Sequence, residues 1–456
     1  MKLKLSRNPQ LRINLRHIHF PQWFYYLLIF PFFKPALLGV MEETWAWWLE
    51  NIFDLWRLGA AGLICVLYAA RMIRWKRMPS PVVILLAVYL GFVALATVIR
   101  ANNIWEIVNY AVTILCFCLL VELRVRAHPR QAVDMIVMPL TVLVLLNFLL
   151  ELIFPLGVVT GGTYGYSYNL LGIDNLLAPI LIPYMFLVSL RSELYHGRLN
   201  WFAYGMIWIA AESLLLVWSA TGLMGMLLGL IYLLFFHGRR GQVLFNFPTA
   251  MAVGAVLFFG IVVFRLQNLL EWLITGVLHK GLSFTGRTDI WDEAIAMFLA
   301  SPFLGYGLSR RGKVYRLRKG KYYHAHNLFL EILVEGGVGA LIAYLAMLFF
   351  AGRKLLKHRE HKYACLLSAL LMTVMLMGAM EPFLDLNGLL IYGSFVLSYY
   401  VGRLIAAEPR EEAEAETPSP SLGNKIPMET ADPAAAAALA AAAEPASAAA
   451  EPDETP

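Results

Sequence analysis

The chain has 456 residues, of which 59% are hydrophobic and 15% are charged, with a formal net charge of +6. Soluble globular proteins contain about 25% charged residues, so this composition excludes an ordinary soluble domain and predicts an integral membrane protein. The four cysteines fall inside apolar stretches, so neither a disulfide framework nor a cysteine metal site is indicated. We expect no cofactor and no nucleic-acid partner.

Apolar stretches recur along most of the chain. A spanning helix needs about 20 mostly apolar residues, and the sequence offers twelve candidates. They are 23–41, 58–72, 80–99, 104–122, 132–155, 176–190, 201–218, 222–236, 247–264, 337–352, 363–380 and 388–405. The first carries Pro31, Lys34 and Pro35 without a small-residue cleavage pattern, so we interpret it as a retained span. The sequence predicts an all-α polytopic membrane protein with about 12 transmembrane helices.

Lys and Arg residues gather in every second loop. Short cytoplasmic loops carry the positive excess in membrane proteins. The N-terminal arm is basic, and the loop at 353–362 holds five Lys or Arg residues, whereas 156–175 and 218–221 hold none. This alternation predicts that both termini lie in the cytoplasm.

Residues 408–456 differ in composition from the rest. They hold eleven acidic residues against Arg410 and Lys425, together with a run rich in Ala and Pro. Such a segment has too little apolar surface to fold. We predict a membrane domain over 1–407 and a disordered acidic cytoplasmic tail over 408–456.

A long loop separates the ninth and tenth predicted spans, at about 265–336. Loops of this length usually have a function. We expect an interfacial helix at 265–278, a second helix at 288–301 and a third at 326–337 that runs into the next span. Arg287 and His326 then lie at helix N-termini, where backbone N–H groups favour anions such as phosphate.

Two stretches of this loop carry a family resemblance. "TGRTDIWDEAIAMFLASPFLGYG" (285–307) and "HAHNLFLEILVEGGVGALIAYL" (324–345) resemble the O-antigen ligase and O-antigen polymerase family of membrane glycosyltransferases. In that family a Gly-Arg-x-x-x-Trp helix, a Pro-x-x-Gly-x-Gly turn and a His-Asn-x-x-Leu helix occupy the large outer loop. The match is specific over 285–345 and architectural elsewhere, and it implies a GT-C-like fold.

The resemblance implies transfer of a glycan from an undecaprenyl-diphosphate-linked oligosaccharide to an acceptor hydroxyl, without a metal, at the outer face of a bacterial cytoplasmic membrane. The family's diphosphate-binding arginine falls on Arg287 and its catalytic histidine on His326. The chemistry of both side chains agrees. A guanidinium holds a diphosphate bidentately, and an imidazole takes a proton near neutral pH. Expected partners are the lipid-linked donor, a lipid or glycan acceptor, and membrane lipids.

One family element is missing. The family often carries Ser-Arg-x-Gly at an earlier outer turn, whereas "WSATGLMGMLLG" (218–229) has Ala220 in the arginine position. The candidates to replace that arginine are Arg265, Arg310, Arg311 and Arg318. The segment 164–179 resembles the family's Gly-x-x-Asn element, with Asn175 in the Asn place.

Other polar residues are candidates for supporting roles. Asp289 lies in the first turn of an expected helix, Asn327 follows His326 in the motif, and Glu381 and Asp385 are placed to orient His326 or an arginine. His324 and His326 suggest a metal pair, but two ligands without a third make a poor site, so we expect none.

The ion-pair partner of Glu212 is a separate question, because this carboxylate lies within the seventh predicted span. Intramembrane carboxylates usually face a cavity or a partner. We expect Glu212 to pair with Lys34, which is also at membrane depth.

Some alternatives stay open. The basic cluster from Arg310 to Lys321 suits anionic headgroups and an acidic or diphosphate ligand equally. Ala220 slightly favours a polymerase over a ligase, but the sequence does not identify the acceptor. A polysaccharide or lipid-carrier transporter is the alternative function, although we see no internal repeat or paired broken helices.

Overall fold

The computed structural model describes residues 20–40, 47–76, 78–100, 104–161, 166–237, 241–266, 287–308, 317, 324–384 and 386–409. The first half contains α1 (Gln22–Ile29), η2 (Phe30–Phe33), α2 (Ala36–Val40), α3 (Trp47–Trp75), α4 (Pro81–Arg100), α5 (Ile104–Ala127), α6 (Pro129–Ile153), β1 (Val159–Gly161), β2 (Tyr166–Tyr168) and α7 (Asp174–His196). The second half contains α8 (Trp201–Val217), α9 (Ala220–Ile231), η4 (Tyr232–Phe236), α10 (Phe247–Leu257), η6 (Phe258–Val263), α11 (Arg287–Ala300), α12 (Leu328–Lys357), α13 (Lys362–Gly378), η10 (Leu386–Gly388), α14 (Leu389–Tyr399) and α15 (Val401–Ala406).

The protein is an all-α polytopic membrane protein, as predicted. Each of the twelve predicted spans falls on a helical segment of the described chain. Among the described residues, six helices are long and apolar enough to cross a membrane, namely α3 to α7 and α12. Six shorter apolar segments cover the other predicted spans. A small antiparallel hairpin, in which Val159 pairs with Tyr168, adds a short β element to the helices.

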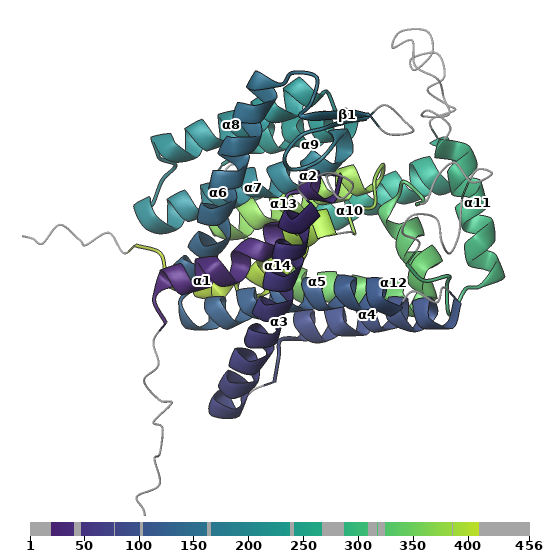
Figure 1. Cartoon of the computed structure of the whole chain (residues 1–456), viewed down its shortest axis with the longest axis horizontal. Coiled ribbons are helices and arrows are strands. Elements are labelled where there is room, and N and C mark those ends of the chain that lie inside the picture. The colour runs from purple at the N-terminus through teal and green to yellow at the C-terminus, as the bar shows by residue number, and fades with distance from the viewer. Residues whose placement is uncertain are drawn as a thin grey trace, which may run out of the picture. The chain divides into compact units, whose positions relative to one another are not determined.

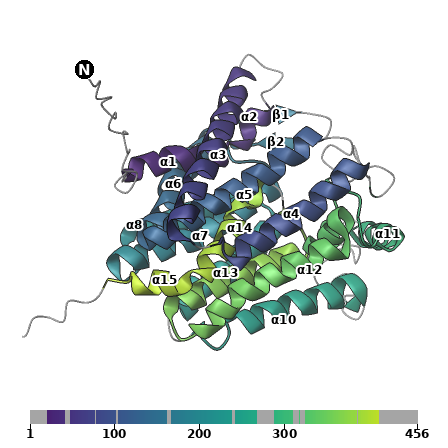
Figure 2. The ribbon, with the colours of Figure 1, turned by 90° about the horizontal axis from the view of Figure 1, so that it is seen from below.

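The helices pack around a buried centre formed by α14. Leu389–Ser398 are buried along the whole of that helix, which contacts α5, α7 and α12. Helices α4 and α12 run side by side, with α10 along the other flank of α12 (Figure 2). Helix α11 lies beyond the ends of α4 and α12 (Figure 1). The loop helix is therefore attached to one end of the bundle.

The predicted pair between Lys34 and Glu212 is wrong. Lys34 Nζ lies 2.7 Å from Glu50 Oε1 and 3.0 Å from Asp54 Oδ1, both on α3. Glu212 is half-buried on α8. A long ammonium side chain pairs with the carboxylates of the neighbouring helix, and the first turns of α3 place two of these beside it.

Candidate functional site

Helix α11 has its own small hydrophobic core. Ile290, Trp291 and Ala294 are fully buried and pack with Leu330 and Val334 of α12. Their spacing puts them on one face of the helix, so that face rests on the beginning of α12. This packing fixes the N-terminus of α11, where Arg287 is the first residue. The helix predicted at 288–301 is thereby confirmed.

The Pro-x-x-Gly-x-Gly turn attaches α11 to the bundle. The backbone N–H of Gly307 donates to Glu335 O at 2.8 Å, and that of Val338 donates to Pro302 O at 2.8 Å. Gly307 has φ +80°, and a Cβ there would lie 2.4 Å from Thr97 Cα. Only glycine fits such a backbone conformation and such a close approach. The motif therefore has a structural role.

The two main candidate residues meet on one carboxylate. Arg287 Nη2 donates to Glu381 Oε1 at 2.6 Å. The same oxygen lies 3.0 Å from His326 Nδ1, and Oε2 lies 3.1 Å from it. Glu381 is 4% exposed. A buried carboxylate needs such donors, because an unpaired charge in the interior is costly.

Asn175 and Ser219 extend this cluster. Asn175 Nδ2 donates to Glu381 Oε1 at 3.0 Å, and Ser219 Oγ donates to Asn175 Oδ1 at 2.7 Å. Ser219 also caps α9, because its Oγ accepts from the backbone N–H of Gly222. The sequence analysis named Asn175 but missed Ser219. The signal for Ser219 is its position before an apolar helix, which is typical of an N-cap.

Local backbone structure aims His326 at Glu381. Asn327 is fully buried and caps α12, since its Oδ1 accepts from the backbone N–H groups of Phe329 and Leu330. Its Nδ2 donates to Ala379 O at 3.1 Å, two residues before Glu381. His326 has φ +48°, a left-handed conformation that is uncommon for a non-glycine residue. Asn327 thus joins the segment of His326 to that of Glu381.

The charge states at this cluster follow from its contacts. Burial raises the pKa of the Glu381 carboxyl, but the hydrogen bond from His326 and the electrostatic attraction of the His326, His324 and Arg287 side chains outweigh it and hold the pKa below its usual range. Burial, with the nearby His326, lowers the pKa of His324 to about 4. At pH 7 Glu381 is therefore ionised and His324 is neutral.

Comparison with known proteins bears on this loop. Residues 205–345 match the sequence model of the family described as O-antigen ligase. The resemblance to the O-antigen ligase family is thereby confirmed. A stretch of 157 residues is 28% identical to the exopolysaccharide production protein ExoQ of Rhizobium meliloti (strain 1021). That alignment covers 31% of this chain, and the chain spans 35% of the length of that relative. Glu381 and Asn175 lie outside the range of the O-antigen ligase match.

Of the replacement arginines, the structure describes Arg265. Its Nη2 donates to Thr288 O at 3.2 Å and also bonds Asp292, and its guanidinium lies 5.2 Å from the centre of the Trp291 ring. Arg265 therefore lies against the first turns of α11, near Arg287. Asp289 is exposed in the first turn of α11. Arg310, Arg311, Arg318, Asp385 and most of the helix predicted at 265–278 lie outside the described residues.

The family arginine position also borders the cluster. Ala220 is exposed and is the first residue of α9, directly after Ser219. Ser219, the residue before it, is linked to Glu381 by two successive hydrogen bonds through Asn175. The arginine of the family would therefore lie next to this cluster, and this protein has alanine in its place.

A third potential metal ligand does accompany the two histidines. Ligand atoms of His324, His326 and Glu381 lie within 4.8 Å of one another. The expectation that no third ligand is near was therefore wrong, because Glu381 is 55 residues from His326 in sequence. A bound cation would displace the hydrogen bonds that Glu381 accepts and would lie beside the Arg287 guanidinium.

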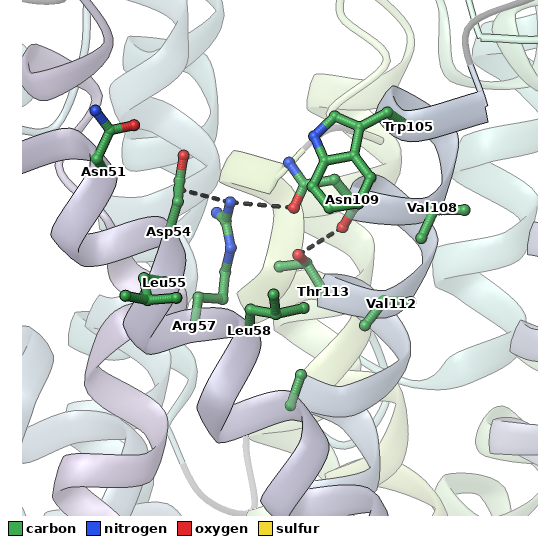
Figure 3. Close-up of a pocket in the computed structure, with 11 residues that line it drawn as sticks. Asn51, Asp54, Leu55, Arg57, Leu58, Trp105, Val108, Asn109, Val112 and Thr113 are labelled. Atoms are coloured by element: carbon green, nitrogen blue, oxygen red, sulfur yellow. Dashed lines mark hydrogen bonds and ion pairs between the residues drawn. The ribbon is translucent and has the colours of Figure 1, made fainter.

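A separate cavity lies between α3 and α5 (Figure 3). Its volume is about 320 Å³, and its polar end holds Asp54, Arg57 and Asn109. Arg57 Nη2 donates to Asp54 Oδ1 at 2.7 Å and to Asn109 Oδ1 at 3.1 Å (Figure 3). The next residue of α5, Tyr110, donates to Leu384 O at 2.5 Å. Helix α5 therefore lies between this cavity and the segment that contains Glu381.

Proposed function

We propose that the protein transfers a glycan from a lipid-diphosphate-linked donor to an acceptor hydroxyl, in the synthesis of a surface polysaccharide. The observation that carries this proposal is the shared contact of Arg287 and His326 with Glu381. In the proposed reaction Arg287 is the cation for the leaving group and His326 is the base for the acceptor, and their common contact with Glu381 supports this pairing of roles. The match of residues 205–345 to the O-antigen ligase family supports the same chemistry.

Arg287 is the proposed ligand of the donor diphosphate. One nitrogen, Nη2, is held by Glu381, which fixes the plane of the guanidinium. A guanidinium has five N–H donors, so others remain for phosphate oxygens. The charge of Arg287 then stabilises the diphosphate as it leaves, and its position at the N-terminus of α11 adds the helix dipole. Arg265 contributes a second positive charge at the same helix turn.

His326 is the proposed general base. Glu381 is ionised and only accepts hydrogen bonds, so His326 carries its proton on Nδ1 and leaves Nε2 basic. Nε2 removes the acceptor hydroxyl proton as that oxygen attacks the anomeric carbon. The bond from that carbon to the diphosphate oxygen breaks, and the electron pair leaves with the lipid diphosphate. His324, neutral and bonded to the His326 backbone N–H, positions the base.

The reaction proceeds without a metal in this proposal, because the charge of Arg287 replaces that of a divalent cation. The site faces the outer side of a bacterial cytoplasmic membrane, with both termini on the inner side, as the distribution of Lys and Arg predicts. A lipid-linked repeat as acceptor makes the protein a polymerase, and a different acceptor makes it a ligase. The undecaprenyl carrier is the expected lipid.

The deciding experiment is a transfer assay with purified protein and lipid-diphosphate-linked oligosaccharide. Elongated or transferred glycan, formed in the presence of EDTA, supports the proposal. Flipping of the same donor across vesicles, without transfer, would show a transporter instead. Product that forms only after a divalent metal is added would refute the metal-free chemistry while keeping the transferase. Arg198→Ala, at an exposed residue of the loop after α7, serves as the control variant.

A further inference from the structure

A second cavity lies at the other end of α5. It has a volume of about 270 Å³ and is formed where α1 begins, α3 and α5 end, and α6 begins. Tyr110 contacts the Glu381 segment near the start of α5, whereas Arg124 lines this cavity 14 residues further along. At 1.5 Å per residue the two places are about 21 Å apart. The cavity is therefore distinct from the proposed transfer site.

Arg124 is buried here without a carboxylate. Its side chain is 4% exposed, and it forms no ion pair within the described part of the chain. Its Nη2 donates to the neutral amide oxygens of Gln22 and Gln131, and its guanidinium stacks over Tyr25 at 3.8 Å. The Nε atom is buried and has no hydrogen-bond partner in the described structure. Among the described residues, the positive charge of Arg124 therefore has no neutralising carboxylate, and its Nε–H has no hydrogen-bond acceptor.

The contrast with Arg57 shows how unusual this is. Arg57 is buried to a similar degree beside the α3–α5 cavity, and Asp54 neutralises it at 2.7 Å (Figure 3). Buried charges in proteins are normally paired in this way. Residues 1–19, which precede α1, contain no Asp or Glu that would supply the missing carboxylate.

The rest of the lining adds positive charge and polar groups. Arg71 and His128 line the cavity together with Arg124, and the amides of Gln22 and Gln131 border it. Arg71 is half-buried at the end of α3 and forms no ion pair with any described carboxylate. At about 30 Å³ for each water, the volume equals roughly nine waters, which is ample for a phosphate group. Two guanidinium groups around a small polar cavity are suited to phosphate oxygens.

We propose that the cavity around Arg124 binds an anion of the phosphate class, either the headgroup of an anionic phospholipid or a soluble phosphate or diphosphate. The anion supplies the charge that Arg124 lacks and accepts from its free Nε. Arg71 closes the site as the second cation. This assignment is independent of the transfer reaction.

The test measures the thermal midpoint of the full-length protein in neutral detergent, with inorganic phosphate or pyrophosphate at constant ionic strength. A second arm compares nanodiscs of phosphatidylcholine with nanodiscs that also contain phosphatidylglycerol. We expect a saturable rise in the midpoint, since a ligand that binds only the folded state stabilises it. A rise with phosphate identifies a soluble anion, and a rise with phosphatidylglycerol alone identifies a lipid headgroup.

The variants separate binding from structure. Arg124→Gln removes the buried charge, so we expect at least a tenfold weaker anion effect together with an anion-free midpoint equal to or above that of the wild type. Arg71→Gln should also weaken the anion effect, and it remains informative if Arg124→Gln does not fold. The control is Arg198→Gln, because Arg198 is exposed, and it should bind as the wild type does.

Two results would overturn the proposal. The first is no response to any of the anions, and the second is equal weakening by Arg198→Gln.

Discussion

The rings of His324 and His326 lie 4.0 Å apart, and the backbone N–H of His326 donates to Nδ1 of His324 at 3.3 Å. The two histidines of one short motif therefore have different environments. His324 accepts a hydrogen bond through a neutral ring, whereas His326 faces a carboxylate. Each difference leads to a measurable prediction.

Acidification should destabilise the protein through His324. The pKa of His324 is about 4 in the folded chain, against about 6.5 in an unfolded one. Between these values the unfolded chain binds a proton that the folded chain does not, so stability falls as the pH drops from 6.5 towards 4. We expect a loss on the order of 2 kcal/mol. Glu381, whose pKa is lowered, adds a loss only below about pH 4.5.

The thermal midpoint between pH 4.5 and 7.5 checks this prediction. His324→Asn keeps an acceptor for the His326 backbone and should flatten the pH dependence. His196→Asn is the control, because His196 is exposed at the end of α7. An unchanged slope in His324→Asn would contradict the assignment.

Replacement of Arg287 should strongly reduce transfer. Arg287→Ala removes the cation that we propose as the diphosphate ligand, and we expect a loss on the order of 10²- to 10³-fold. Arg287→Lys keeps the charge but loses the planar fork, so it should be intermediate. Rates and donor affinity, measured beside Arg198→Ala, check the prediction. Near-wild-type turnover with unchanged donor affinity in Arg287→Ala would mean that the diphosphate binds elsewhere.

Glu381→Gln should reduce the rate while the protein still folds. The amide oxygen can still accept from Arg287 and Asn175, but His326 loses the carboxylate that fixes its proton on Nδ1. We expect a rate loss of about 10²- to 10⁴-fold. Donor affinity should stay close to that of the wild type. A slow variant with weakened donor binding would restrict Glu381 to holding Arg287.

His326 itself is tested by pH and donor binding together. As a base it must be unprotonated, so wild-type activity should rise with pH along its acid limb. His326→Ala should lose about 10²- to 10⁴-fold in rate and still bind the donor, and His324→Ala should lose much less. If His326 acts only as a cation on the diphosphate, activity falls as the pH rises and donor binding weakens in His326→Ala.

Gly307→Ala should release the loop helix from the bundle. A Cβ at Gly307 would lie 2.4 Å from Thr97 Cα, and φ is +80°. We expect a destabilisation on the order of 2–4 kcal/mol, with loss of transfer because α11 carries Arg287. Gly91→Ala in α4 is the matched control, since nothing lies within 4 Å of its added Cβ. Thermal midpoints and transfer rates of the two variants should diverge.

The sequence predicted the helices well and the site only in part. The length of the apolar stretches located the helical segments. The residues of the first turn and Pro302 placed the two ends of α11 within one residue of their observed positions. The kink at Gly337 separates the predicted loop helix from the predicted span inside α12. These features are local, so periodicity and breaker residues suffice to find them.

The contacts between distant segments were harder to predict. Glu381 lies 94 residues from Arg287 and 206 from Asn175, and spacing along the chain carries no signal for such contacts. Lys34 was predicted to pair with Glu212 of a distant span. The sequence does not show that α3 packs beside Lys34 and brings Glu50 and Asp54 into contact with it. The position of Glu381 at the end of a predicted span suggested that it orients His326 or an arginine, but it did not show that one carboxylate contacts both.

The spread of the cluster along the chain also sets when activity can begin. Asn175, Ser219, Arg287 and His326 are all made before Glu381, which immediately precedes the last apolar helices. A ribosome that has not passed residue 381 has therefore produced a chain whose arginine and histidine lack their common partner. In the proposed mechanism, the growing protein stays inert during synthesis, and it becomes competent only when its final hydrophobic segments have joined the bundle.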